Sequence, residues 1–128
     1  MSDPDEVTCV HPADRQLADP TPGKAREQAI AVAGLWSGLV TTEPGVASGW
    51  HHHGDHDTSV YVIEGTVRIE FGPAGEHAAE AGPGDFVHIP PHVVHREVNA
   101  GSTTSREIIS RSGTGPLTVN VEGPVRSP

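Results

Sequence analysis

Glycine and proline interrupt this chain so often that no long helix fits between them. The 128 residues include 15 Gly and 12 Pro, and both residue types break or end regular elements. The runs between them are short and rich in Val, Ile, Thr and Tyr, which favour strands. We therefore predict an all-β domain of about ten short strands, a number and spacing typical of a sandwich or barrel.

The expected strands follow one another closely along the chain. They cover residues 29–33, 35–42, 46–53, 59–63, 66–71, 77–81, 86–89, 93–98, 106–111 and 117–121. The first run is rich in Ala and is also compatible with a short helix. Residues 72–75, Gly-Pro-Ala-Gly, have the composition of a hairpin turn.

The chain length predicts one domain with additions at both ends. Residues 1–27 are polar and contain four prolines, so we expect an N-terminal arm that stays mobile or docks on the outside of a barrel. Residues 28–122 are expected to form the barrel domain, and residues 123–128 an irregular C-terminal tail.

The formal net charge of −9, with 8 Lys and Arg in total, excludes the basic surface that nucleic acids or anionic lipids require. No secretory signal or membrane span is expected, since the sequence lacks a long apolar run. Cys9 is the single cysteine, which rules out an internal disulfide. We expect a cytoplasmic protein that binds a small molecule.

Histidines are concentrated in one short segment. His51, His52 and His53 are consecutive, and His95 follows more than forty residues later. A strand sends alternate side chains to opposite faces, so His51 and His53 project from one face with Cα atoms roughly 6.5–7 Å apart. Two imidazoles so placed can converge on one metal ion, while His52 points the other way.

Two segments, residues 45–65 and 84–99, resemble the two signature motifs of the cupin superfamily. The first motif is G, five residues, H-x-H, three or four residues, E, six residues, G. Its matches are Gly45, His51, His53 and Gly65. The second motif is G, five residues, P-x-G, two residues, H, three residues, N. Its matches are Gly84, Pro90, His95 and Asn99, with His92 in place of the motif glycine.

The resemblance implies a double-stranded β-helix, the jelly-roll barrel of cupins, with His51, His53 and His95 as ligands of a divalent metal ion. One motif position departs from the family, because Thr58 stands where a metal-binding glutamate is usual. A threonine hydroxyl is a poor ligand. Water can complete the shell, or the shorter motif spacing presents Asp57, or His56 supplies a fourth imidazole. Zinc, iron, manganese, nickel and copper all accept imidazole.

Fold does not fix function, so two classes of function follow from the resemblance. The first is a small metal-dependent enzyme for an oxygen-rich metabolite such as a diketone, a polyketide or an aromatic compound. It would act as a dioxygenase or as a Lewis-acid catalyst such as a cyclase or isomerase, with Asp57 or His56 as candidate general base. The second is a non-catalytic binding module that serves as a sensor, store or accessory subunit.

We also expect a homodimer. Barrels of this size expose edge strands unless another chain covers them, and the N-terminal arm is long enough to cross to a partner.

Overall fold

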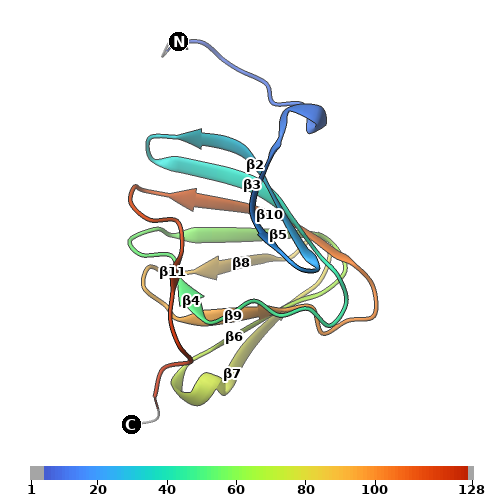
Figure 1. Ribbon diagram of the computed structural model, residues 1–128, viewed down its shortest axis with the longest axis vertical. Helices are drawn as coiled ribbons and strands as arrows, with labels where there is room; N and C mark the ends of the chain where they lie inside the picture. Colours follow the sequence, from blue (N-terminus) through green and yellow to red (C-terminus); the bar gives the residue numbers. More distant parts are fainter. Residues whose placement is uncertain (1–4, 127–128) are drawn as a thin grey trace.

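The protein folds into two antiparallel β-sheets that face each other (Figure 1). The computed structural model describes residues 5–126. These residues contain eleven strands and two 3-10 turns, η1 (Pro12–Asp14) and η2 (Pro73–Gly75), and no α-helix. No helix in this part of the chain is long and apolar enough to span a membrane. The all-β jelly-roll prediction is confirmed.

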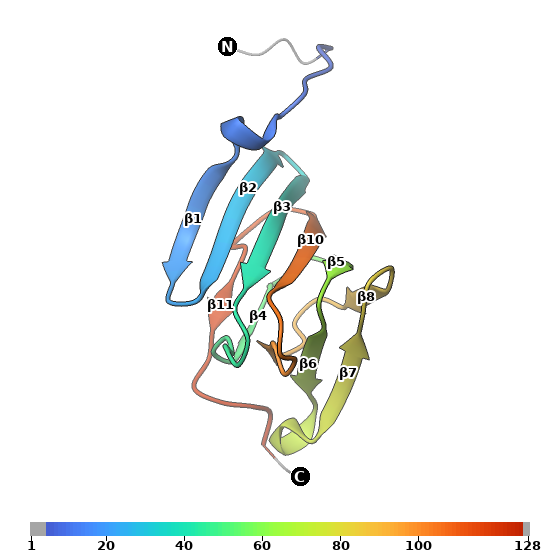
Figure 2. The ribbon, with the colours of Figure 1, turned by 90° about the vertical axis from the view of Figure 1, so that its right-hand side faces the viewer.

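The two sheets contain six and five strands. The larger sheet has the order β1 (Gln16–Thr21), β2 (Lys24–Val32), β3 (Leu35–Thr42), β10 (Ser105–Ser112), β5 (Thr58–Glu64), β8 (Phe86–Ile89). The smaller has the order β11 (Val119–Asn120), β4 (His51–His52), β9 (His95–Val98), β6 (Val67–Phe71), β7 (His77–Ala81). Because β10 lies between β3 and β5 (Figure 2), and β9 between β4 and β6 (Figure 1), distant parts of the chain meet in each sheet.

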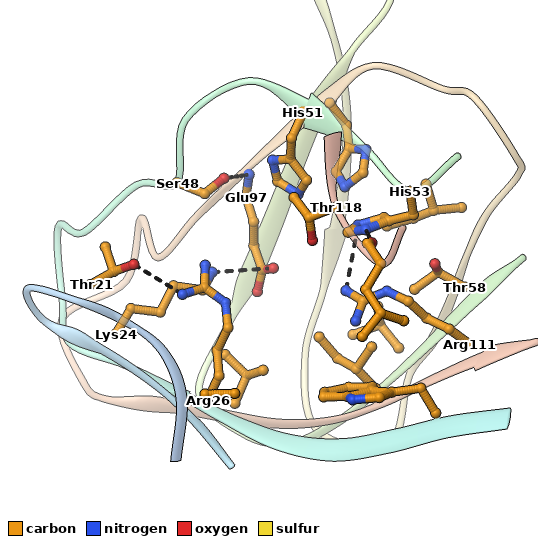
Figure 3. Close-up of a pocket in the computed structure, with 18 of the residues that line it drawn as sticks. Thr21, Lys24, Arg26, Ser48, His51, His53, Thr58, Glu97, Arg111 and Thr118 are labelled. Atoms are coloured by element: carbon orange, nitrogen blue, oxygen red, sulfur yellow. Dashed lines mark hydrogen bonds and ion pairs between the residues drawn. The ribbon is translucent and has the colours of Figure 1, made fainter. Parts of the chain in front are cut away.

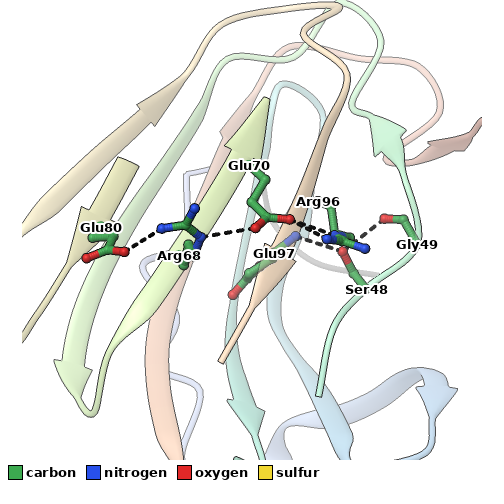
Figure 4. Close-up of polar contacts among 7 residues, drawn as sticks. All are labelled: Ser48, Gly49, Arg68, Glu70, Glu80, Arg96 and Glu97. Atoms are coloured by element: carbon green, nitrogen blue, oxygen red, sulfur yellow. Dashed lines mark hydrogen bonds and ion pairs between the residues drawn. The ribbon is translucent and has the colours of Figure 1, made fainter. Parts of the chain in front are cut away.

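Strand alternation separates the core from the surface. In β6, Val67 and Ile69 point into the barrel and are 2% and 3% exposed. Arg68 and Glu70 point outward and join a row of ion pairs that runs from Glu80 through Arg68 and Glu70 to Arg96 (Figure 4). These charges therefore belong to the outer surface of the smaller sheet.

The N-terminal arm is shorter than the sequence indicated. Residues 16–27 form β1 and the first part of β2, both paired within the larger sheet, while only the segment before η1 extends away from the barrel (Figures 1 and 2). The hydrophobic pattern missed these strands because the inward positions of β2, Lys24, Arg26 and Gln28, line a polar cavity. Residues 1–4, and residues 127–128 of the predicted tail, lie outside the described part of the chain.

The expected strand 29–33 is confirmed over residues 29–32 as the last part of β2, so the helix alternative does not hold. Two other predicted elements change in the structure. The expected strand 46–53 is reduced to β4, preceded by a single bridge between Ala47 and Val98. The expected strand 117–121 is reduced to β11. Pro44, Gly45 and Gly49 lie in the irregular stretch before β4, where regular pairing is weakened.

The motif glycine Gly65 lies in the tight turn between β5 and β6. Its φ is +78°, and a Cβ atom there would lie 2.7 Å from the Cα of Ser105. A side chain would therefore force β5 and β10 apart near the end of β5. At the second motif, His92 takes a φ of +62°, the left-handed conformation for which the usual glycine is suited.

Candidate metal centre

His51, His53 and His95 converge on the wall of one cavity, and Figure 3 shows His51 and His53 there. His51 lies in β4 directly opposite His95 in β9, and His53 follows β4 on the same side of the chain. The three rings lie 4.4 to 5.0 Å apart, centroid to centroid. One potential ligand atom from each residue lies within 4.8 Å of the other two. The structure thus brings together the three residues that the sequence proposed as ligands.

Each of the three rings is oriented by a backbone carbonyl. The Nδ1 atoms lie 2.8 Å from Gly49 O for His51, 2.7 Å from Leu117 O for His53 and 2.8 Å from Val93 O for His95. A carbonyl only accepts, so each Nδ1 carries the hydrogen and donates it. The lone pair is then on Nε2. Histidine ligands of metals are typically held by an outer hydrogen bond of this kind.

The cluster is electrically neutral near pH 7. Burial lowers the pKa of His51 to about 4 and that of His53 to about 2, with further lowering from neighbouring His95 and Arg111, respectively. Burial also lowers the pKa of His95. Three neutral imidazoles with their lone pairs on Nε2 form a donor set that fits a divalent transition metal ion. The Nε2 lone pair of His53 accepts a hydrogen bond from Arg111 Nη2, 3.5 Å away.

The other candidate ligands point elsewhere. Asp57 is exposed, and its Oδ1 lies 2.7 Å from Nε2 of His88 on the outside of the barrel. His56 is buried, but its Nδ1 lies 2.5 Å from Ser112 O and its Nε2 3.2 Å from Gly115 O. The structure therefore does not bring Asp57 or His56 to the histidine cluster. Short polar loops place side chains by local hydrogen bonds, which motif spacing does not reveal.

Thr58, at the motif position of the usual glutamate, does reach the site. Its side chain lines the cavity, is 1% exposed, and has a buried Oγ1 with no hydrogen-bond partner. The position thus faces the cavity that the three histidines also line, but its side chain carries no charge.

The histidines open into a cavity of about 780 Å³ between the two sheets. Trp36, Val40, Val60, Ile89 and Ile109 supply the apolar part of the wall. Four charged residues also line it: Lys24, Arg26, Glu97 and Arg111. The cavity wall therefore carries three cationic side chains and one carboxylate, in a chain whose net charge is −9.

The carboxylate is already paired. Lys24 Nζ lies 3.3 Å from Glu97 Oε2, and both side chains are largely buried. Burial alone raises the pKa of Glu97, but the charge and hydrogen bond of Lys24, together with a hydrogen bond from Glu107, more than offset this, and the pKa falls to about 2. Behind it, Glu107 is fully buried, and burial followed by the charge of Glu97 raises its pKa well above the usual value. Glu107 thus favours the neutral acid.

Arg111 stands next to the histidine cluster. Its Nη2 lies 3.5 Å from His53 Nε2, and its guanidinium carbon lies 5.1 Å from the centre of the Trp36 ring. Burial lowers the pKa of Arg111 to about 10, so the side chain stays charged at neutral pH.

Sequence reasoning missed Lys24, Arg26 and Arg111. The first two fell within the presumed arm, and the third looked like an ordinary strand residue. The sequence does carry a signal for them, because every second residue of a strand lies on the same face. Lys24, Arg26 and Gln28 share one face of their strand, and Glu107, Ile109 and Arg111 share one face of theirs. Inward polar residues at that period indicate a polar cavity.

Residues 38–110, more than half of the chain, match the family model for the cupin domain. The chain belongs to the cupin family. A search of curated proteins finds no match to the sequence.

Solved structures agree with the cupin fold. KdgF from Halomonas sp. superposes with a TM-score of 0.73 at 24% identity, over 86% of this cupin and 96% of KdgF. An RmlC-like cupin from Shewanella frigidimarina gives 0.65 at 23% identity, over 81% of this chain and 88% of that one. Oxalate decarboxylase from Bacillus subtilis gives 0.68 at 24% identity, over 80% of this chain but 28% of the larger enzyme. At these identities the likeness concerns the fold.

Proposed function

We propose that this cupin is a small metal-dependent enzyme that acts on a small oxygen-rich metabolite. The Nε2 atoms of His51, His53 and His95 would hold a divalent ion. When bound, such an ion polarises a substrate oxygen or activates water or dioxygen. The observation that carries the proposal is the convergence of three neutral imidazoles, each fixed by a carbonyl at Nδ1, on a cavity large enough for a metabolite.

The cavity residues would bind and orient the substrate. Trp36 and the aliphatic wall exclude water from one side, while Thr58 and Arg111 offer hydrogen-bond donors beside His53. Glu97 is the carboxylate on the wall and is held ionised beside Lys24, so its Oε atoms can accept a hydrogen bond from a substrate hydroxyl. Asp57 is directed outward and offers no such acceptor in the cavity.

Metal analysis of paired variants tests this proposal. His53→Ala is expected to lose both bound metal and turnover, whereas His52→Ala, its neighbour in the same histidine run, is expected to keep both. The control is matched because His52 Nδ1 accepts a hydrogen bond from Gly54 N, 3.0 Å away, and lies outside the cluster. Elemental analysis of the purified protein identifies the ion. Turnover without metal would refute the proposal, and an inert metal would favour the alternative of a binding module.

We also propose that the protein is a homodimer. An apolar row crosses the outer face of the larger sheet, where Ile108 pairs with Leu39 on one side and Tyr61 on the other, and Tyr61 pairs with Phe86. Phe86 is 73% exposed and Ile108 41% exposed. A second copy packed on this face would cover both.

Light scattering tests the dimer. The wild type should have twice the mass of one chain, and Ile108→Asp should have the mass of one chain. A monomeric wild type would contradict the proposal. Residence in the cytoplasm stays a prediction.

A further inference from the structure

The cavity contains a cation, Arg111, that no carboxylate contacts directly among the described residues, while Glu97 and Glu107 attract it from farther away. Arg111 forms no ion pair with a carboxylate in the described range 5–126, and its buried Nε has no hydrogen-bond partner. The Trp36 ring, against which the guanidinium lies, supports it but accepts no conventional hydrogen bond. A buried donor of this kind is costly unless a ligand satisfies it.

Thr58 lies directly across from this cation. Thr58 in β5 and Arg111 in β10 are cross-strand partners in the register of the larger sheet, and both line the cavity. The Thr58 hydroxyl is also buried without a partner. Two buried atoms without hydrogen-bond partners, Arg111 Nε and Thr58 Oγ1, thus belong to neighbouring side chains beside His53 (Figure 3).

Charge indicates which ligand would satisfy both groups. Arg111 reaches to 3.5 Å from His53 Nε2, the atom that would ligate a metal cation. Two cations so close repel each other, and the repulsion is strong where water is excluded. An anion between them removes the repulsion. In the cupin motif the side chain at the position of Thr58 is usually the carboxylate of a glutamate, and this chain supplies none there.

We propose that Arg111 and Thr58 form the binding site for a carboxylate group of a small-molecule substrate, beside His53 and at the motif position where related proteins usually carry glutamate. The role of this site in catalysis rests on the proposed metal-dependent function. Binding of the anion itself requires only residues of the chain. Guanidinium groups bind carboxylates by two parallel hydrogen bonds, which leaves the hydroxyl of Thr58 to donate a third.

Pairs of probes that differ in charge but hardly in shape test the proposal. Benzoate, lactate and glucuronate are each compared with the corresponding amide by calorimetry, on zinc-loaded and on zinc-free protein. At least one carboxylate is expected to bind roughly tenfold or more tightly than its amide, the size of a charge-assisted hydrogen bond. The ¹⁵N–¹H signal of Arg111 Nε should shift with the same dissociation constant. Equal binding within all three pairs would overturn the proposal.

Single-residue variants test whether the carboxylate binds at Arg111. Arg111→Gln should abolish the preference for the carboxylate, while Arg106→Gln should keep it, because Arg106 lies on the same strand but pairs with Glu64 at the surface. Thr58→Glu should also abolish the preference, since the new carboxylate would take the place of the ligand and pair with Arg111. Circular dichroism and metal content confirm that each variant folds. A carboxylate preference that survives in folded Arg111→Gln refutes the assignment.

The two proposals fail in different ways. A protein that binds no metal, yet prefers carboxylates through Arg111, would refute the proposed function and support the anion site. A metal-loaded, active protein with no preference between carboxylates and amides would do the reverse.

Discussion

Acid is expected to destabilise the metal-free protein through its buried histidines. In the unfolded chain a histidine has a pKa of about 6.5, but burial lowers the pKa of His51 to about 4 and that of His53 to about 2 in the folded protein. Between these values the unfolded state binds more protons than the folded state. Stability from these groups is therefore complete above pH 6.5 and is lost as the pH falls.

The magnitude at pH 5 depends little on the folded pKa values. An unfolded histidine gains about 2 kcal/mol from protonation at pH 5, and a folded one with a pKa of 4 or lower gains about 0.1 kcal/mol or less. His51 and His53 should thus each remove about 2 kcal/mol from the free energy of unfolding between pH 8 and pH 5. That is a large part of the 5–15 kcal/mol typical of a whole domain.

One variant isolates the contribution of His53. His53→Asn keeps an N–H group near the place of Nδ1, which can still donate to Leu117 O, but the side chain does not titrate. Urea unfolding is followed by tryptophan fluorescence in a chelator at pH 8 and pH 5. The loss of stability should be about 2 kcal/mol smaller in the variant than in the wild type.

The variant must be compared with the wild type because Glu107 changes stability with pH in the direction opposite to the histidines. Its raised pKa means that stability from this group is lost as the pH rises above the ordinary value for glutamate. The wild-type curve alone is a sum of both effects. A variant His77→Asn, at an exposed position on β7, serves as the control and should lose as much stability as the wild type. The reasoning is refuted if His53→Asn also loses as much.

Three other outcomes follow from the structure. Zinc at one hundred times its dissociation constant should stabilise the wild type by about 2.7 kcal/mol and should not stabilise His95→Ala. Thermal melts measure both effects, and an equal rise of the melting temperature in the two proteins would contradict the metal site. Asn99→Ala should cost about 3 kcal/mol in urea, because the buried amide makes three hydrogen bonds to backbone groups. Gly65→Ala should cost about 3 kcal/mol, since its Cβ meets Ser105 and its φ is positive; unchanged urea midpoints in either variant would refute these contacts.

Most strands could be predicted because their inward faces are apolar. Val67, Ile69 and Phe71 alternate with charged residues in β6, and the glycines between the strands mark the turns. The same logic failed for β2, where the inward residues are Lys24, Arg26 and Gln28. Hydrophobic periodicity reports burial against a core, so a strand that faces a polar cavity looks like a loop.

The sequence by itself determined the fold class and the three histidines that meet, because strand alternation and motif spacing are local properties of the chain. The tertiary structure alone decided that Asp57 and His56 turn away and that Thr58 and Arg111 stand opposite each other beside His53. Those two are more than fifty residues apart in the sequence. Their pairing follows from the register of β5 against β10, and register depends on how the whole sheet packs rather than on either strand.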